Sequence, residues 1–384
     1  MIRTGLDVLM RDPALVRGRT LGLVAHPASV DGSLRHTRDL LASVATLKVL
    51  FGPEHGWGGA AQDMIGVTDE EVESERVVSL YGETAADLQP RIEDLKGLDA
   101  VVVDLQDVGA RYYTYVWTAA FMLRTASKVG VPVIVLDRPN PLGGVVTEGR
   151  PQRPGYRSFV GLYEVPVRHG LTIGEILEMV RRRERIDEEA LHVVPMEGWT
   201  RSMWFDDTGL PWVLPSPNMP TLDTATVYPG GCVIEGTTLS EGRGQTRPFE
   251  IWGAPWLDGG TLASVEVEGA TLRPLVFEPT FQKHAKLACG GVQVHVTDRE
   301  RFRSYAAYLR WLGAAIGSRP EGTAPWRTEI YEYDFRRPAI DLLTGGPEYR
   351  QLVNANASLD DYVREDEKGA AAFEEERRSL FRYD

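Results

Sequence analysis

The segment Phe51-Gly-Pro-Glu-His-Gly56 places a carboxylic acid next to an imidazole, in backbone that proline and glycine hold in a tight loop. A positioned acid can protonate a leaving oxygen, and a second carboxylate can act as base or nucleophile, which is the chemistry of glycoside hydrolysis. Glu54 is therefore the leading candidate for a catalytic acid. The alternative is a loop carboxylate that caps a helix or faces water. His55 is expected either to serve as base or ligand, or to pack within the loop.

Further polar side chains follow four apolar runs of the chain, at 21–25, 47–51, 100–104 and 132–136. In doubly wound sheets, ligands bind beyond the carboxyl ends of the strands. If these runs are parallel strands, the side chains that follow them converge at one rim. Those side chains are His26, Glu54, His55, Gln106, Asp107, Arg111, Asp137, Arg138 and Asn140.

Two of these residues, Asp107 and Asp137, are candidates for the second carboxylate. An aspartate after a strand also often caps the next helix or pairs with an arginine, so a structural role stays open for each. Arg111 is expected to bind an anionic group or to pair with Asp107. The ring of Tyr113 is compatible with a sugar platform.

A second polar cluster lies in the strings Pro215-Ser-Pro-Asn-Met-Pro-Thr221 and Ser240-Glu-Gly-Arg-Gly-Gln-Thr-Arg-Pro-Phe249. The glycines of the second string permit close approach of the backbone to a ligand. Two arginines in such a loop indicate a carboxylate or another anion in the substrate, whereas the alternative is a loop that ties two domains together. The candidate binding residues are Asn218, Glu241, Arg243, Thr246 and Arg247.

These residues need a scaffold, and the alternation of apolar runs with helical patterns predicts a doubly wound α/β sheet. The runs are apolar on both faces, as in a mostly parallel sheet. Residues 198–256 lack periodicity and are predicted to form a long loop that serves function or covers a site. Helices are predicted at 34–45, 86–96, 117–129, 172–183 and 303–316, further strands at 191–195 and 292–296, and a charged helical or frayed tail from 364.

Composition excludes several classes of partner. The net charge of −13 disfavours nucleic acid, and no stretch approaches the ~18 apolar residues that a membrane helix needs. Because the first residues contain no long apolar run, a cytoplasmic location is expected. Cys232 and Cys289 are expected to be buried thiols. We find no nucleotide-binding glycine motif and no recognised metal-ligand spacing, so neither cofactor nor metal is predicted. Oligomeric state is not indicated.

Seven long strings give the chain a resemblance to a known family. They are FGPEHG, DLQDVGARYYTY, VIVLDRPNPLGG, RSFVGLYEVPVRHGLT, PSPNMPTLDTATVYPG, EGTTLSEGRGQTRPFE and CGGVQVHVTDR, in order from roughly residue 20 to 300. In these strings the chain resembles the NamZ family of exo-β-N-acetylmuramidases. The resemblance implies a Rossmann-like domain joined to a smaller α/β domain, with the site in the cleft between them. We place the domains at 1–250 and 251–384.

The resemblance also implies an activity, the hydrolysis of a terminal, non-reducing N-acetylmuramic acid from peptidoglycan fragments, with Glu54 as catalytic glutamate. The lactyl carboxylate of that sugar would give Arg111, Arg243 or Arg247 a partner. Tyr113 or the acetamido group of the substrate are substitutes for a second carboxylate. Three alternatives stay open: a muramyl-saccharide-binding protein without turnover, a hydrolase of another glycan, and a metal-dependent hydrolase.

Overall fold

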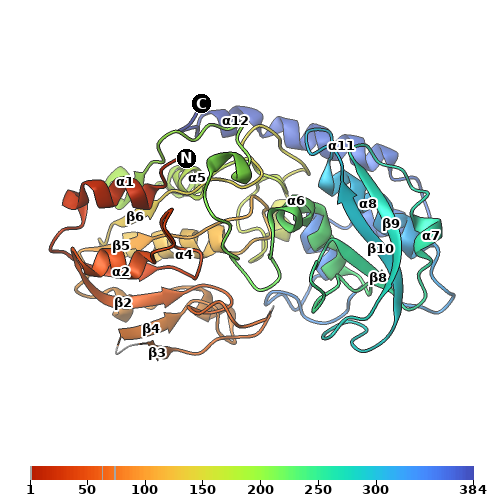
Figure 1. Cartoon of the computed structure of the whole chain (residues 1–384), viewed down its shortest axis with the longest axis horizontal. Helices are drawn as coiled ribbons and strands as arrows, with labels where there is room; N and C mark the ends of the chain where they lie inside the picture. Colours follow the sequence, from red (N-terminus) through yellow and green to blue (C-terminus); the bar gives the residue numbers. More distant parts are fainter. Residues whose placement is uncertain (1, 63, 73–74) are drawn as a thin grey trace.

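Two β-sheets of different construction organise the chain, as Figure 1 shows. The computed structural model describes residues 2–62, 64–72 and 75–384. The larger sheet has the order β3-β4-β2-β1-β5-β6-β7, and all its neighbouring strands are parallel except β3 with β4. Its strands are β1 Thr20–Val24, β2 Thr46–Gly52, β3 Glu70–Val72, β4 Glu75–Ser79, β5 Ala100–Val103, β6 Val133–Leu136 and β7 Leu191–Val194.

Helices cover both faces of the larger sheet because successive side chains of each strand point to opposite faces. On one face, Leu23 and Val102 pack with Leu6 of α1. On the other face, Val101 and Val103 belong to the same apolar cluster as Trp117 of α4. The predicted doubly wound, mostly parallel α/β sheet is confirmed. The covering helices are α1 Gly5–Arg11, α2 Thr37–Ala42, α4 Tyr115–Lys128 and α5 Ile173–Glu184.

The smaller sheet is antiparallel and has the order β8-β10-β9. Helix α6 packs on α8 so closely that a Cβ at Gly230 would lie 2.2 Å from the carbonyl oxygen of Ser304. Residues from α6 onward therefore take part in the packing of the C-terminal part, and the domain boundary placed at residue 250 stays a prediction. The elements are β8 Ile251–Ala254, β9 Ala270–Phe277, β10 Cys289–Val296, α6 Leu222–Gly231, α7 Gly259–Leu262 and α8 Ser304–Gly317.

The C-terminal helices lead the chain back to the larger sheet, and Figure 1 shows α11 and α12 crossing the top of the view toward the N-terminus. The segment after α12 reaches the buried carboxylate of Asp137, which accepts a hydrogen bond of 2.6 Å from the Tyr383 hydroxyl. Thr172 and the Gly174 amide also donate to Asp137 at the start of α5. Four helices form this return: α9 Ala339–Thr344, α10 Glu348–Asn354, α11 Asp360–Ala372 and α12 Glu374–Arg378.

Several elements differ from the sequence prediction for local reasons. The helix predicted at 86–96 is two short pieces, η2 Ala85–Leu88 and α3 Ile92–Leu95, because Pro90 cannot continue a helix. The helix predicted at 34–45 begins only at Thr37, since Leu34 has a positive φ of 64°. The predicted loop 198–256 contains α6 and β8. The remaining 3₁₀ segments are η1 Pro13–Leu15, η3 Pro154–Tyr156, η4 Glu188–Ala190, η5 Phe205–Thr208 and η6 Cys232–Gly236.

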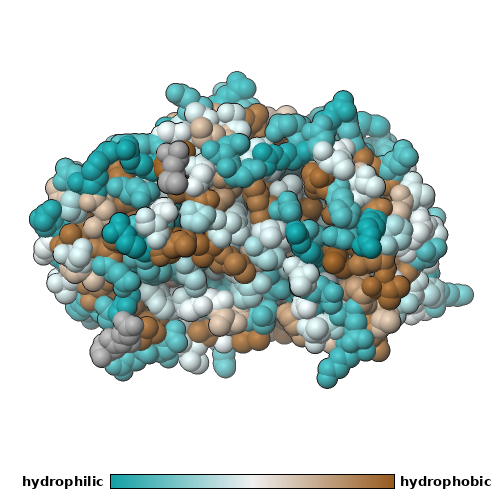
Figure 2. All heavy atoms as spheres, in the orientation of Figure 1, coloured by the Kyte–Doolittle hydropathy of each residue, from teal (hydrophilic) through white to brown (hydrophobic). Residues whose placement is uncertain are grey.

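The molecular surface and the two cysteines can be compared with what the amino-acid composition led us to expect. Figure 2 shows polar and charged side chains over most of one face, with apolar side chains in small separate groups. Within the described residues, none of the helices is both long and apolar enough to cross a bilayer. Cys232 and Cys289 are buried thiols, as expected.

We expect Tyr383→Phe to lower the free energy of unfolding by about 1–3 kcal/mol, because Asp137 and the Met196 amide each lose a buried hydrogen-bond partner. Urea denaturation measures the change. Tyr156→Phe, at a half-buried tyrosine, serves as control and should stay within about 0.5 kcal/mol of the parent. Equal stabilities for the two variants would contradict the role of Tyr383.

Candidate active site

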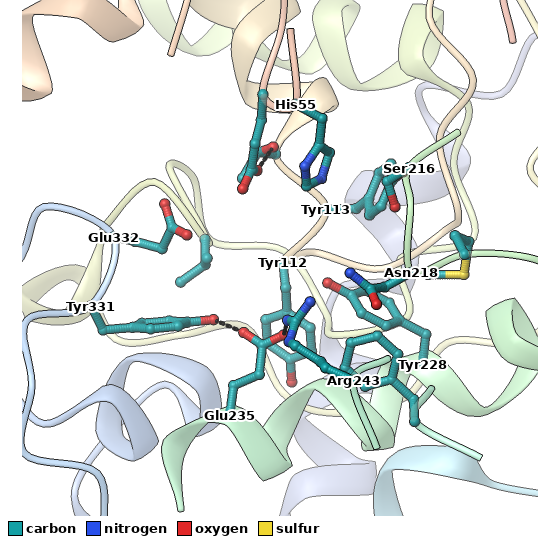
Figure 3. A pocket seen from close by; sticks show the side chains of 15 residues that line it. His55, Tyr112, Tyr113, Ser216, Asn218, Tyr228, Glu235, Arg243, Tyr331 and Glu332 are labelled. Carbon is teal, nitrogen blue, oxygen red and sulfur yellow. Dashed lines mark hydrogen bonds and ion pairs between the residues drawn. The ribbon is translucent and has the colours of Figure 1, made fainter. Parts of the chain in front are cut away.

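A pocket lies beyond the carboxyl ends of β2 and β5, where the two parts of the chain meet. Polar, charged and aromatic side chains from both parts line it. Figure 3 shows His55 on one side and Glu235, Arg243 and Tyr331 on the opposite side, while Glu332 reaches the pocket from a third side. The lining residues are Glu54, His55, Tyr112, Tyr113, Thr114, Val160, Ser216, Asn218, Met219, Tyr228, Glu235, Arg243, Phe249, Tyr331 and Glu332.

Glu54 reaches the pocket because β2 ends in a sharp turn. A Cβ at Gly52 would lie 2.6 Å from the Trp57 amide nitrogen, so only glycine permits this close approach. The Glu54 side chain is buried, and its Oε2 accepts a hydrogen bond of 2.6 Å from the hydroxyl of Thr114, which precedes α4. The Tyr115 hydroxyl donates to the Glu54 carbonyl at 3.3 Å. The acid is therefore oriented by the first turn of α4.

His55 sits in left-handed backbone with a φ of 71° and lines the same pocket. Its Nδ1 lies 2.8 Å from the Ala61 carbonyl oxygen. Because a carbonyl only accepts hydrogen bonds, Nδ1 donates to it, which leaves Nε2 for a hydrogen bond to a group such as a sugar hydroxyl.

Tyr113 and Asn218 supply neutral polar groups. The Tyr113 hydroxyl is buried and has no hydrogen bond of normal geometry within the described residues, although Ser216 is adjacent. Burial raises the pKa of Tyr113 well above its ordinary value, so the phenol stays a neutral donor. The Asn218 amide donates to Gln62 at 3.0 Å.

A buried ionic cluster forms the wall opposite His55. Arg243 donates to Oε1 of Glu241 at 2.8 Å and to Oε1 of Glu235 at 2.7 Å. Lys283 lies 3.0 Å from the second oxygen of Glu241, and the Tyr331 hydroxyl donates to Oε2 of Glu235 at 2.6 Å. Burial opposes the charged form of Glu241, but Lys283 and Arg243 outweigh it and lower the pKa of this carboxyl to about 2.

Two glutamates of the pocket, Glu235 and Glu332, were not among the residues that the sequence singled out. Glu235 is 4% exposed and Glu332 is 5% exposed. Glu332 accepts the hydroxyl of Tyr81 at 3.2 and 3.3 Å. A charged residue inside the apolar string Val233-Ile-Glu-Gly236 was a usable signal, because buried carboxylates need partners. Nothing comparable marks Glu332.

The structure brings only part of the sequence-predicted set to this pocket. The residues that line it are Glu54, His55, Tyr113, Asn218 and Arg243, and Glu241 stands behind Arg243 as its partner. The others are not among the residues that line the pocket: His26, Gln106, Asp107, Arg111, Asp137, Arg138, Asn140, Thr246 and Arg247. Among the residues that the structure describes, no group of three or more His, Cys, Asp and Glu side chains is arranged to hold a metal ion.

The two aspartates proposed as second catalytic groups lie outside the pocket lining. Asp137 caps α5, and burial raises its pKa. Asp107 accepts the Gly109 amide at 2.8 Å and lies 3.3 Å from Nε2 of the buried His169. Their contacts explain both residues as supports of the loops that follow β5 and β6.

The arginines and amides of the sheet rim are likewise used for structure. Arg111 is fully buried and donates to the carbonyls of Arg150, Val165 and Leu343, which links distant segments. Arg138 makes a bidentate pair with Asp104 at 2.5 and 2.8 Å. The remaining amides, Gln106 and Asn140, donate to the carbonyls of Asp107, Pro139 and Leu171.

His26 and the outer part of the arginine-rich loop also lie away from the pocket. Burial lowers the pKa of His26 to about 3, so its ring is neutral. The backbone amide of Gln106 donates to Nε2 at 3.0 Å, and Nδ1 lies 3.3 Å from the Pro215 carbonyl oxygen. Thr246 is exposed. Arg247 pairs with Asp223 at 3.1 Å and with Glu250 at 3.3 Å.

A doubly wound sheet and a smaller antiparallel sheet thus enclose acids, tyrosines and an arginine, which defines a two-part α/β protein with a site for a polar ligand. The chain belongs to the NamZ exo-β-N-acetylmuramidase family. Residues 21–223 match the N-terminal region of that family and residues 226–383 match its C-terminal region.

Relatives extend this similarity over the whole chain. The peptidoglycan β-N-acetylmuramidase NamZ of Bacillus subtilis (strain 168) is 40% identical over 392 aligned positions, which cover 100% of this chain and 91% of the relative. A crystal structure of a DUF1343 family protein from Bacteroides fragilis superposes with a TM-score of 0.86 at 30% identity, covering 100% of this chain and 99% of that chain. A second protein of that bacterium, at 24% identity, shares the fold with a TM-score of 0.75 and the same coverage.

The pKa of Glu241 predicts how stability depends on pH. The carboxyl has an ordinary pKa of 4.5 and a folded pKa of about 2, so its charged form stabilises the fold above pH 4.5. This contribution is lost as the pH falls through about 2. We expect Glu241→Gln to be less stable than the parent near neutral pH, with the difference shrinking over that acid range.

Urea midpoints measured from neutral to acid pH test this expectation. Glu266→Gln, at an exposed glutamate, is the control and should follow the parent. A constant difference between Glu241→Gln and the parent at all pH values would contradict the assignment.

Proposed function

We propose that this protein hydrolyses the terminal, non-reducing N-acetylmuramic acid from peptidoglycan fragments. The observation that carries the proposal is the buried, oriented carboxyl of Glu54 in a pocket that residues of both parts of the chain line. Membership in the NamZ family supports it, as does the name of the Bacillus subtilis relative, a peptidoglycan β-N-acetylmuramidase.

Glu54 acts as the general acid. It gives its proton to the glycosidic oxygen as the bond to the anomeric carbon breaks, so that the leaving sugar departs as a neutral alcohol. The Thr114 hydrogen bond fixes the rotamer of the acid, and a fixed acid avoids the entropy of ordering during the reaction. The neutral phenol of Tyr113 and Nε2 of His55, which line the same pocket, bind hydroxyl or acetamido groups of the sugar.

Arg243 recognises the lactyl carboxylate that distinguishes muramic acid from glucosamine. It is the arginine that the structure brings to the pocket, whereas Arg111 and Arg247 are engaged elsewhere. A guanidinium offers a planar fork of five N–H donors, and because Nε and Nη2 already donate to Glu241 and Glu235, the lactyl carboxylate is a third acceptor around the same cation. The charges of Glu235, Glu241 and Lys283 around it hold the fork in one orientation.

Glu54→Gln should fold normally and lose about 10²–10⁴-fold in kcat on a disaccharide with N-acetylmuramic acid at its non-reducing end, because the amide cannot donate the required proton. Product release followed by chromatography measures the rate. Glu70→Gln, at an exposed glutamate of β3, is the matched control and should keep parental activity. Parental turnover by Glu54→Gln would exclude this residue as the acid, and saturable binding without product by the parent would favour a binding protein.

Arg243→Lys should weaken competitive inhibition by free N-acetylmuramic acid about 10–100-fold, because lysine keeps the charge but not the fork. Inhibition by N-acetylglucosamine, which lacks the lactyl carboxylate, should change little. Arg247→Lys is the control and should leave both inhibition constants unaltered, since Arg247 lies outside the pocket lining. Equal weakening of both inhibitors by Arg243→Lys would assign Arg243 a structural role only.

A further inference from the structure

A tight turn at Tyr331–Asp334 has an unusual backbone. The Asp334 amide donates to the Tyr331 carbonyl at 2.9 Å, and both central residues have positive φ, 45° at Glu332 and 62° at Tyr333. A turn with two positive φ angles normally carries Asn, Asp or Gly at these positions. Glutamate and tyrosine are unfavourable there, and such strain persists only where the surrounding contacts impose it. An observed outlier of this kind points to a functional constraint.

The contacts that impose the turn come from both parts of the chain. On the C-terminal side, the Tyr331 hydroxyl donates to Glu235 at 2.6 Å. On the side of the larger sheet, the Tyr333 hydroxyl donates to the Gly82 carbonyl at 2.8 Å, and the Tyr81 hydroxyl donates to Glu332. The rings of Tyr81 and Tyr333 meet edge to face at 5.5 Å. The turn is therefore a strap that joins the two walls at the pocket.

The strained backbone has one visible result, which is the placement of a third glutamate in the pocket. Glu332 lines the same cavity as Glu54 and is 5% exposed (Figure 3). Both carboxyls also act on one phenol, because Glu332 and Glu54 each contribute to raising the pKa of Tyr333, after the larger effect of burial. The two acids thus share one site, which Glu54 enters from the turn after β2 and Glu332 from the turn at Tyr331–Asp334.

We propose that Glu332 is the second catalytic carboxylate and acts as the general base on the attacking water. This inference rests on the proposed function. Glu54 protonates the glycosidic oxygen, and the electron pair of the broken bond stays with that oxygen. The water oxygen forms the new bond to the anomeric carbon while Glu332 takes one proton from the water. The products are two free sugars, and Glu54 and Glu332 return to their starting states by exchange of one proton with solvent.

The other carboxylates are less suited to this role. Glu235 is held by Arg243 and by Tyr331, which fixes it as part of the binding wall. Asp107 and Asp137 lie outside the pocket lining. Direct attack of a water on the anomeric carbon is a single displacement that takes place on the face opposite the leaving group, so this mechanism inverts the anomeric configuration.

Two substrates with different leaving groups separate the roles of the acids. Glu54→Gln should lose activity on a muramyl disaccharide and recover most of it on a 2,4-dinitrophenyl muramide, whose leaving group needs no proton. Glu332→Gln should lose about 100-fold or more in kcat on both substrates, because the water lacks a base in either case. Glutamine can still accept the hydrogen bond of Tyr81. If Glu332 had only a structural role, Glu332→Gln would therefore keep parental activity, and that result would overturn the proposal.

Two further measurements keep the test independent of folding. Glu329→Gln, at a glutamate of the same segment whose side chain is 72% exposed, should keep parental rates and melting temperature. Proton NMR of the parent should show the α anomer of N-acetylmuramic acid first, and initial formation of the β anomer would overturn the base role. If the parent releases no muramic acid at all, the proposed function fails. If it turns over normally and Glu332→Gln does too, only this inference fails.

Discussion

The burial of Arg243 between Glu235 and Glu241 is the constraint on which the C-terminal wall of the pocket depends. All three side chains are less than 5% exposed, with Arg243 at 3%, Glu235 at 4% and Glu241 at 2%. A charge removed from water costs several kcal/mol unless it is paired and hydrogen-bonded. Lys283 and Tyr331 complete the pairing from segments further along the chain. The folded state must therefore bring these three segments together, and it does so at the surface that faces Glu54. The same contacts therefore compensate the buried charges and form this wall of the pocket.

The opposite wall follows from the topology of the larger sheet. The strand order β2-β1-β5 creates a crevice at β1, which is the place where doubly wound sheets commonly bind ligands. In this structure, side chains and backbone of the protein itself occupy that position. The neutral ring of His26 bonds to the Gln106 amide and lies against the Pro215 carbonyl, which also accepts the Tyr115 hydroxyl. The segment that contains Pro215 is thus fixed over the crevice, and its next residues, Ser216 and Asn218, line the pocket beside it. The site is displaced toward the end of β2, where Glu54 emerges.

Local patterns predicted β1, β2, β5 and β6 well because these strands are short apolar runs whose burial needs no knowledge of distant partners, whereas β3 and β4, which carry charged residues at one edge of the sheet, were not predicted. The same reasoning found Glu54 and His55, since a turn directly after a buried strand of an α/β sheet must face its carboxyl edge. It did not distinguish them from Asp137 and Arg111, because a polar residue at a strand end serves a helix cap or a buried carbonyl equally well. Which use prevails depends on partners such as Tyr383, far along the chain. Glu235 and Glu332 of the C-terminal wall were not predicted for the same reason, because their roles depend on contacts with residues distant in the sequence.

The site is completed by segments that no single part of the chain contains. The larger sheet contributes an oriented acid, and the C-terminal part contributes the arginine and two more glutamates. Packing of the two parts against each other does not by itself fix the distances between their side chains, yet proton transfer to a sugar requires fixed distances. The turn at Tyr331–Asp334 resolves this conflict, because it is bonded to Glu235 on one wall and to Gly82 on the other. Positive φ angles at Glu332 and Tyr333 are tolerated here since a relaxed turn would withdraw a carboxylate from the pocket and break the direct link between the walls.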